Sequence, residues 1–248
     1  MRDRFFLIAG ILGLGTIAMT LVLALIGPRQ IGPLPPGFIT PVMAFEFAET
    51  PAEVQTLFRP EGSAAAMDRV NRWDFLYMAL YNAFLGVFAL AAARHSGRRF
   101  FYIPAALALV ILAADALENV QLLGITRLLG DGEIAPILGQ LSPLLGRLRF
   151  YTWLKWGGLA LYGLLIAVYF RGLPGRWRWV APVVVLPAVL AVLALVARGL
   201  PHELMALGVG VMFVLLTVFA WRAAGGDALH VVADSNPPQN EGGFKTVA

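Results

Sequence analysis

Three polar residues interrupt a long apolar stretch in the middle of the chain, and their types and spacing could support chemistry. Asp115, Glu118 and Asn119 stand at positions i, i+3 and i+4 of the segment VILAADALENVQLL. In a helix this spacing places all three side chains on one face. Two carboxylates beside an amide could act as an acid–base pair or bind a small polar ligand.

The chain also supplies a cation that can reach the same depth. This cation is Lys155, in the segment YTWLKWGG. The chain has one other lysine, which lies in the C-terminal tail. If the apolar stretches are membrane helices, Lys155 lies about 6–8 Å inside one end of its helix, and Asp115 lies about 22 Å along its own helix from Phe100. A lone carboxylate or ammonium at this depth would change its protonation state. We therefore expect Lys155 to pair with Asp115 or Glu118, with Asp74 nearby.

Two further segments add residues to this candidate polar core. Asp74, Tyr77 and Tyr81 follow an i, i+3, i+7 spacing, so they share a helix face. Glu46 and Glu49 lie in the segment TPVMAFEFAETPAEVQTLFRPEG, which precedes that helix.

The segment that holds these glutamates carries two helix-start signals. Thr40-Pro41 and Thr50-Pro51 each combine an N-cap residue with proline at the first helical position, and Glu53 completes a capping box. We expect residues 40–59 to form short helices over the mouth of the bundle, with Glu46 or Glu49 aimed at the polar core. The glutamates would share one stripe if the second helix continued the first.

The composition indicates what these elements belong to. The chain has 248 residues, of which 59% are hydrophobic and 14% charged, a balance typical of a polytopic membrane protein. A membrane-spanning helix needs about 20 apolar residues. Six stretches qualify, which predicts an all-α membrane helix bundle with spans at about 5–26, 73–93, 100–123, 151–170, 179–197 and 204–221.

The remaining segments complete the predicted domain organisation. We assign residues 1–224 to the transmembrane domain, with an uncleaved first helix, and residues 225–248 to a disordered tail. The loop over residues 124–150 is apolar enough to lie on the membrane, and Ser142-Pro143 is a candidate start for the fourth long helix. Trp156 and the other tryptophans near helix ends are typical of interface anchors.

Arginines in short loops predict the orientation. One side of the bundle collects the sequences RHSGRRF and RGLPGRWRW together with Arg2, Arg4 and Arg222. The positive-inside rule places this side, and both termini, in the cytoplasm. The amino-acid usage is typical of a GC-rich bacterial genome, which predicts a bacterial inner-membrane protein.

Several functional classes find no support in the sequence. The chain has no cysteine, which excludes disulfides and thiolate ligands. It has three dispersed histidines, no nucleotide-binding or hydrolase motif and no acidic metal-binding loop. We therefore expect no metal, no cofactor and no nucleic-acid partner, because the basic residues are explained by topology. His202 and Glu203 are interpreted as features of a loop and helix start.

The spacing of the acidic residues, Asn119 and Lys155 is similar to that in a group of uncharacterised multi-pass bacterial membrane proteins. The short motifs D-x-x-E-N and K-W, preceded by a glutamate-containing segment and a Trp-Asp-Phe helix start, carry the resemblance over residues 40–160. It implies a membrane bundle and supplies no activity. The residues involved are Glu46, Asp74, Asp115, Glu118, Asn119 and Lys155.

Three functions remain open at this point. First, the polar core could bind or transport a small polar, ionic or lipid-headgroup ligand. Second, the protein could be an enzyme that acts on lipid-linked substrates with an Asp/Glu acid–base pair whose pKa values Lys155 adjusts. Third, the protein could be a structural or accessory subunit of a larger membrane complex. A purely structural network is the alternative explanation, because interhelical polar contacts stabilise membrane bundles by about 0.6–2 kcal/mol each. Membrane lipid is the expected partner in every case.

Overall fold

The computed structural model describes residues 3–130 and 134–226, and throughout these residues the chain is all-α, as predicted. Within these described residues, six helices are long and apolar enough to cross a membrane. They are α1 (Arg4–Ile26), α4 (Ser63–Ser96), α5 (Tyr102–Gly130), α6 (Ile134–Arg171), α7 (Val180–Val196) and α8 (Leu200–Gly225). The predicted multi-pass membrane protein agrees with this count and with these lengths.

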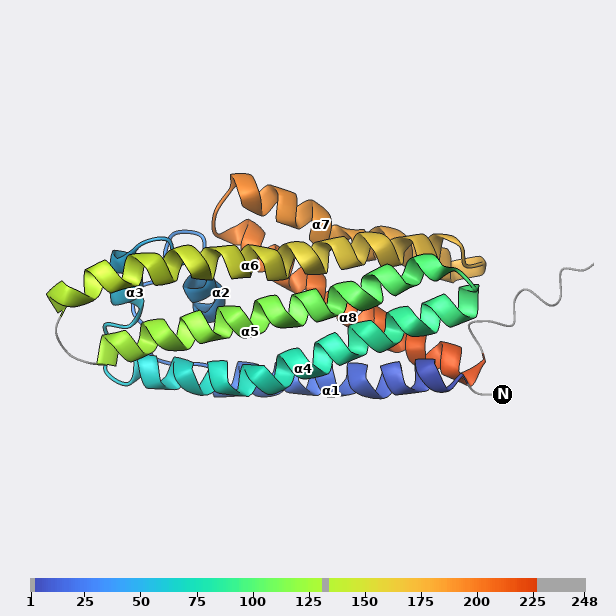
Figure 1. Ribbon diagram of the computed structural model, residues 1–248, viewed down its shortest axis with the longest axis horizontal. Coiled ribbons are helices and arrows are strands. Elements are labelled where there is room, and N and C mark those ends of the chain that lie inside the picture. Colours follow the sequence, from blue (N-terminus) through green and yellow to red (C-terminus); the bar gives the residue numbers. More distant parts are fainter. Residues whose placement is uncertain (1–2, 131–133, 227–248) are drawn as a thin grey trace, which may run out of the picture.

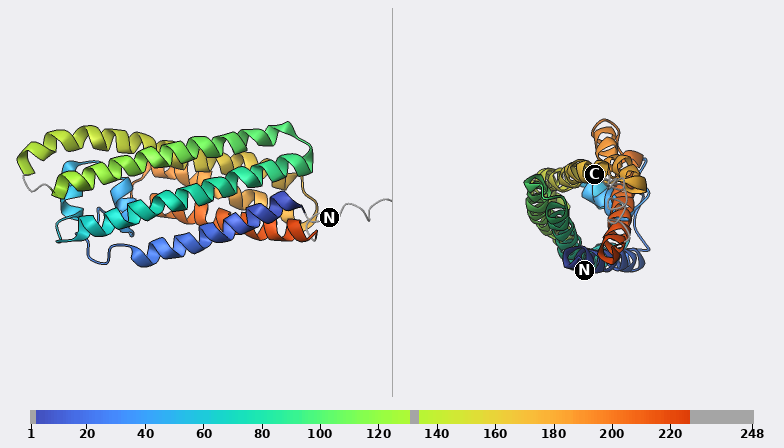
Figure 2. Two further views of the ribbon diagram at one scale, coloured as in Figure 1. Left: turned by 60° about the horizontal axis from the view of Figure 1, so that its bottom comes forward. Right: turned by 90° about the vertical axis from the view of Figure 1, so that its right-hand side faces the viewer.

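The long helices form a ring. Each packs against the next in the order α1, α4, α5, α6, α7, α8, and α8 closes the ring on α1. The lengthwise view in Figure 1 and the end-on view in Figure 2 show this arrangement. An even number of spans brings both ends of the described chain to one end of the bundle, here named the terminal end.

Two short helices cover the opposite end. They are α2 (Pro41–Glu46) and α3 (Pro51–Leu57), and residues 38–57 are here named the strap. Thr40 Oγ1 accepts a hydrogen bond from the Met43 N–H at 3.4 Å, and Thr50 Oγ1 accepts one from the Glu53 N–H at 3.3 Å. Both predicted N-caps are therefore confirmed, and they set where α2 and α3 begin.

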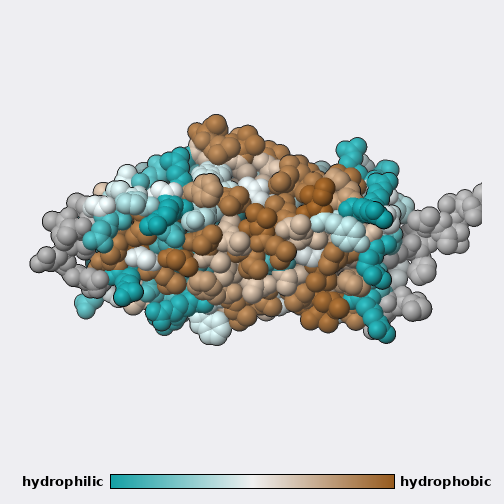
Figure 3. Space-filling view, in the orientation of Figure 1, coloured by the Kyte–Doolittle hydropathy of each residue, from teal (hydrophilic) through white to brown (hydrophobic). Residues whose placement is uncertain are grey.

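The surface of the bundle has the pattern that a bilayer requires. Figure 3 shows an apolar belt between two hydrophilic ends. The large exposed side chains in this belt are apolar, as for Leu109 at 69% exposure and Val192 at 62%. Exposure of such side chains to water would be costly, whereas lipid covers them without penalty.

The helices at the strap end are longer than the predicted spans. The segment 124–150, expected to be a loop on the membrane, instead extends α5 to Gly130 and begins α6 at Ile134, so Ser142-Pro143 does not start the helix. Pro143 lies inside α6. Proline removes the bond to the carbonyl four residues earlier, and that residue, Gly139, is exposed, so water can satisfy the carbonyl.

Helix α8 is the last of the long helices in the described part of the chain. Helix α8 ends at Gly225, next to the predicted limit at residue 224. The predicted disordered tail lies outside the described residues from 227 onward.

Glycines set how closely α1 and α8 approach. A Cβ atom on Gly13 would lie only 2.2 Å from Thr217 Oγ1, and one on Gly10 would lie 3.0 Å from the Trp221 ring. The two helices therefore cross tightly near the terminal end. At the strap end, larger residues of the same helices instead face a cavity.

Candidate polar site

Lys155 is the centre of the buried polar site. Its Nζ atom lies 3.1 Å from Glu46 Oε2 and 3.5 Å from Asp115 Oδ1, and it also forms an ion pair with Glu118. Lys155 is 6% exposed, Asp115 3% and Glu118 0%. The predicted pairing of Lys155 with the D-x-x-E-N face is confirmed, and Glu46 adds a third carboxylate from the strap.

A neighbouring side chain donates a hydrogen bond to each of these acids. The Tyr81 hydroxyl donates to Asp115 Oδ2 at 2.5 Å, the Thr152 hydroxyl donates to Glu118 Oε1 at 2.6 Å, and the Trp156 indole N–H donates to Glu46 Oε2 at 3.0 Å. Charge-assisted bonds of this kind fix both partners in one geometry. The site is therefore preorganised.

Asp74 and Asn119 extend the network along α4 and α5. The Asn119 side-chain amide donates to Asp74 Oδ2 at 2.6 Å. Asn119 is buried whereas Asp74 is only partly buried. Asp74 thus stands at the border between the network and the open space beside it.

That open space is a cavity of about 590 Å³ under the strap. Its polar floor consists of residues from the predicted core, and Glu118 and Asn119 lie behind this floor. The floor residues are Glu46, Asp74, Tyr77, Tyr81, Asp115 and Lys155.

The walls of the cavity are apolar. Leu23 and Leu25 at the end of α1, Met43 of α2, and Val209 and Phe213 of α8 contribute to them. Leu25 is 73% exposed, so the wall reaches the surface of the protein. This combination of an apolar wall and a charged floor suits an amphiphilic ligand.

Aromatic side chains fill the bundle between this floor and the terminal end. Phe88 packs against Phe6, Phe170 and Phe219 with ring centroids 5.8, 6.2 and 6.0 Å apart. All four rings are fully buried. The cavity therefore ends at the polar floor in this conformation.

Glu49 is not part of the polar core, contrary to the sequence-based prediction. Helix α2 ends at Glu46 and α3 begins only at Pro51, so the glutamates do not form one stripe. Glu49 instead lies 3.9 Å from Arg198 in the turn between α7 and α8. The ion pairs of Lys155 are with Glu46, Asp115 and Glu118 instead.

Arg198 holds the strap at this second location. It donates from Nη1 and Nη2 to Glu53 at 2.6 and 2.7 Å, and to the Phe47 carbonyl at 2.8 Å. Hydrogen bonding and proximity to Glu53 raise the pKa of Arg198, and Arg198 lowers the pKa of Glu53. The ion pair ties α3 to the α7–α8 turn.

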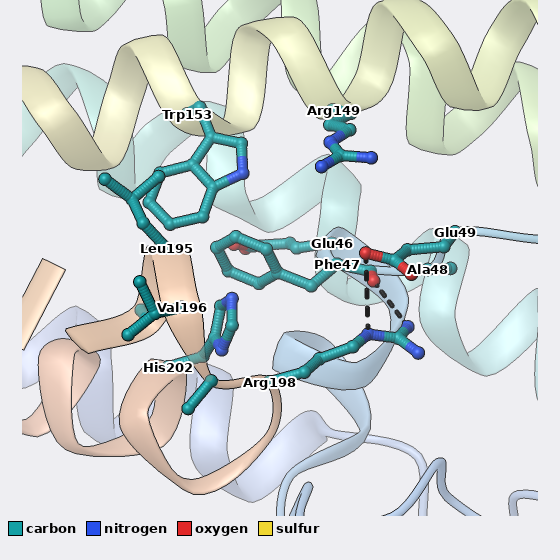
Figure 4. Close-up of a pocket in the computed structure, with 12 residues that line it drawn as sticks. Glu46, Phe47, Ala48, Glu49, Arg149, Trp153, Leu195, Val196, Arg198 and His202 are labelled. Carbon is teal, nitrogen blue, oxygen red and sulfur yellow. Dashed lines mark hydrogen bonds and ion pairs between the residues drawn. The ribbon is translucent and has the colours of Figure 1, made fainter. Parts of the chain in front are cut away.

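A second hollow, of about 270 Å³, lies between this ion pair and α6. Figure 4 shows Arg198 beside Glu49, with His202, Phe47, Trp153 and Arg149 around the space. His202 is 3% exposed and packs against Phe47 with ring centroids 4.1 Å apart. Glu46 lines both hollows, so the strap separates them.

Glu203 contributes more than the expected helix start. Its Oε1 atom accepts hydrogen bonds from the Ile39 and Thr40 N–H groups at 2.9 and 2.8 Å. The first turn of α8 therefore fixes the beginning of α2. Sequence reasoning treated this residue as a local feature, because a partner 163 positions away leaves no local signal.

Sequence reasoning also missed Thr152 and Trp156 as members of the site. Thr152 stands at i−3 from Lys155, a spacing that indicates a shared helix face. Trp156 was expected to be an interface anchor, but it is 8% exposed and binds Glu46. Their positions beside the one lysine of the transmembrane domain were the available signal.

Searches of protein-family models, curated proteins and solved structures find no match to this chain.

Proposed function

We propose that this protein binds a small amphiphilic ligand, with a polar head and an apolar chain, in the cavity under the strap. The cavity itself carries the proposal. Apolar walls lead from the protein surface at Leu25 to a floor that presents Asp74, Asp115 and Lys155. Such a gradient places a chain against the wall and a polar head at the floor.

The geometry favours binding over the other functions considered. An enzyme that used Asp115 and Glu118 as an acid–base pair would need both carboxylates in the cavity. Asp115 lines the cavity, whereas Glu118 is fully buried and bound to Thr152 and Lys155. A through-transporter would need a path past the floor, where the packed rings of Phe88 and Phe170 lie. An accessory subunit would have no need of this cavity.

We further infer that the protein lies in the bacterial cytoplasmic membrane with its terminal end inside. The arginine-rich connections Arg98–Arg99 and Arg176–Arg178 support this orientation. The cavity then opens toward the outer leaflet. The resemblance to uncharacterised multi-pass bacterial proteins fits the same assignment.

A blocked cavity tests the proposal. Ala24 lines the mouth and is exposed, so Ala24→Trp should occlude the cavity without disturbing the core. Ala113→Trp is the matched control, because Ala113 is exposed on α5 near Asp115 and lies outside the cavity lining.

The measurement is the amphiphile retained by each purified protein, detected by native mass spectrometry. We expect native chain and Ala113→Trp to retain a bound amphiphile, and Ala24→Trp to lose it. Equal retention by Ala24→Trp and the control would overturn the proposal.

A further inference from the structure

We propose that the polar head of this ligand is an ammonium group, held by Asp74 and Asp115 between aromatic side chains. This inference rests on the proposed function and adds the chemical class of the ligand. Three observations support it: the excess of carboxylates over ammonium groups in the site, the aromatic rings that line the cavity, and the exposure of Asp74 to the cavity.

The acids of the site outnumber its cation. Glu46, Asp115 and Glu118 surround Lys155, and Asp74 lies in the cavity floor, where it accepts a hydrogen bond from Asn119. Four carboxylates with one ammonium leave a formal surplus of three negative charges when all are ionised. Buried surplus charge is costly, so the cluster either takes up protons or recruits a second cation.

Asp74 is the carboxylate best placed to meet that cation. It lines the cavity and is partly exposed. Among the described residues, the Asn119 amide donates a hydrogen bond to Asp74 Oδ2, and no cationic side chain forms an ion pair with Asp74. A carboxylate with acceptor capacity to spare can bind an ammonium N–H at the floor.

Aromatic rings surround the same space. The Tyr77 and Tyr81 centroids are 5.2 Å apart, and the Tyr81 ring stacks on Phe213 at 5.5 Å. Aromatic faces attract cations, most strongly where water is excluded. The ammonium of Lys155 already uses both kinds of contact, since it pairs with the acids and lies 5.1 Å from the Trp156 ring centroid.

Other polar heads fit less well. An anionic head would meet the carboxylates of Glu46, Asp74 and Asp115, while Lys155 is already shared among three acids. A metal ion would need converging carboxylates, and in the described part of the chain Lys155 Nζ occupies the point where they converge. Arg29 also lines the cavity but is exposed, next to the end of α1, so its charge is solvated.

Three amphiphiles that differ only in the head decide the question. Dodecylamine, dodecanol and dodecanoate are titrated against the native chain in lipid nanodiscs at neutral pH. Each titration is repeated with Ala24→Trp to identify binding in the cavity. We expect the amine to bind at least about tenfold more tightly than the alcohol, a ratio typical of one charge-assisted hydrogen bond.

Asp74→Asn gives the second test. It keeps the shape and an acceptor for Asn119 but removes the charge. We expect it to weaken amine binding about tenfold and to leave alcohol binding within about twofold. Asp68→Asn is the control, because Asp68 lies on the same helix, pairs with Arg72 and does not line the cavity.

The outcomes separate this inference from the proposed function. Cavity binding in which the alcohol or the carboxylate equals or exceeds the amine would overturn the ammonium head and preserve the amphiphile site. If none of the three amphiphiles binds in a way that Ala24→Trp weakens, both the ammonium head and the amphiphile site are overturned. The head-group series on the native chain decides even if Asp74→Asn fails to fold.

Discussion

Lys155 Nζ on the membrane helix α6 lies 3.1 Å from Glu46 Oε2 on the strap helix α2. This ion pair joins a residue inside the bundle to a segment that covers it. The polar site is therefore complete only when the strap is in place, and several measurable properties depend on this connection.

Removal of the central cation should destabilise the protein. Lys155→Met leaves Asp115 and Glu118 buried without their partner, which typically costs about 3–5 kcal/mol. Adding Glu118→Gln removes one of the unpaired charges and should restore part of the loss. The free energy of unfolding in mixed detergent micelles measures both variants. Arg147→Met, an exposed change on the same helix, should have an effect within about 0.5 kcal/mol. Single and double effects that simply add would contradict the pairing.

The strap should loosen when Glu46 loses its charge. Glu46→Gln retains an acceptor for the Trp156 N–H but not the ion pair with Lys155. We expect faster amide hydrogen exchange over residues 41–46 and little change within α4 or α5. Glu61→Gln, an exposed change outside the strap, serves as control. Unchanged exchange in α2 would show that Glu203 and the apolar contacts hold the strap without Glu46.

Acid should release α3 from the α7–α8 turn. The pKa of Glu53 is lowered by Arg198, so the ionised form is favoured in the folded state. Its stabilising effect is fully present above the ordinary glutamate pKa of about 4.3 and is lost as pH falls through the lowered value. We therefore expect amide hydrogen exchange of residues 51–57, after correction for its intrinsic pH dependence, to become faster only when the pH falls below the ordinary glutamate pKa. Arg198→Gln should remove this dependence, and a transition near neutral pH would contradict it.

The orientation can be measured on the same chain. Because the sequence has no cysteine, Glu61→Cys introduces one thiol at the strap end. An impermeant maleimide should label it in intact cells, and a C-terminal reporter should respond as cytoplasmic. Labelling of Glu61→Cys only after lysis would reverse the assignment.

The sequence predicted the helical class, the strap helices and the central pairing, because each follows from local rules. Apolar length identifies a span, Thr-Pro identifies a helix start, and an isolated buried lysine needs an acid. The direction of Glu49 and the extra turns of α5 and α6 did not follow. The first depends on the break between α2 and α3, and the second on the packing of α5 against α6; neither has a periodic signal.

The cavity also escaped detailed prediction. Its walls come from α1, α2 and α8, and the close approach of α1 to α8 at Gly13 and Thr217 is a tertiary contact. One glycine in an apolar helix does not reveal which neighbour approaches it. Likewise, the attachment of the strap by Arg198 depends on Glu53, which lies 145 positions away in the sequence and gives no local signal.

Photo-crosslinking tests the central claim most directly. An amphiphile with a diazirine in its chain is irradiated with the native protein in nanodiscs, and the labelled peptides are mapped by mass spectrometry. Adducts are predicted on the wall residues Leu23, Ala24, Leu25, Val42, Met43, Val209 and Phe213, and they should be lost in Ala24→Trp but not in Ala113→Trp. Labelling confined to the lipid-facing surface of α7, at Val189, Val192 and Val196, would contradict it.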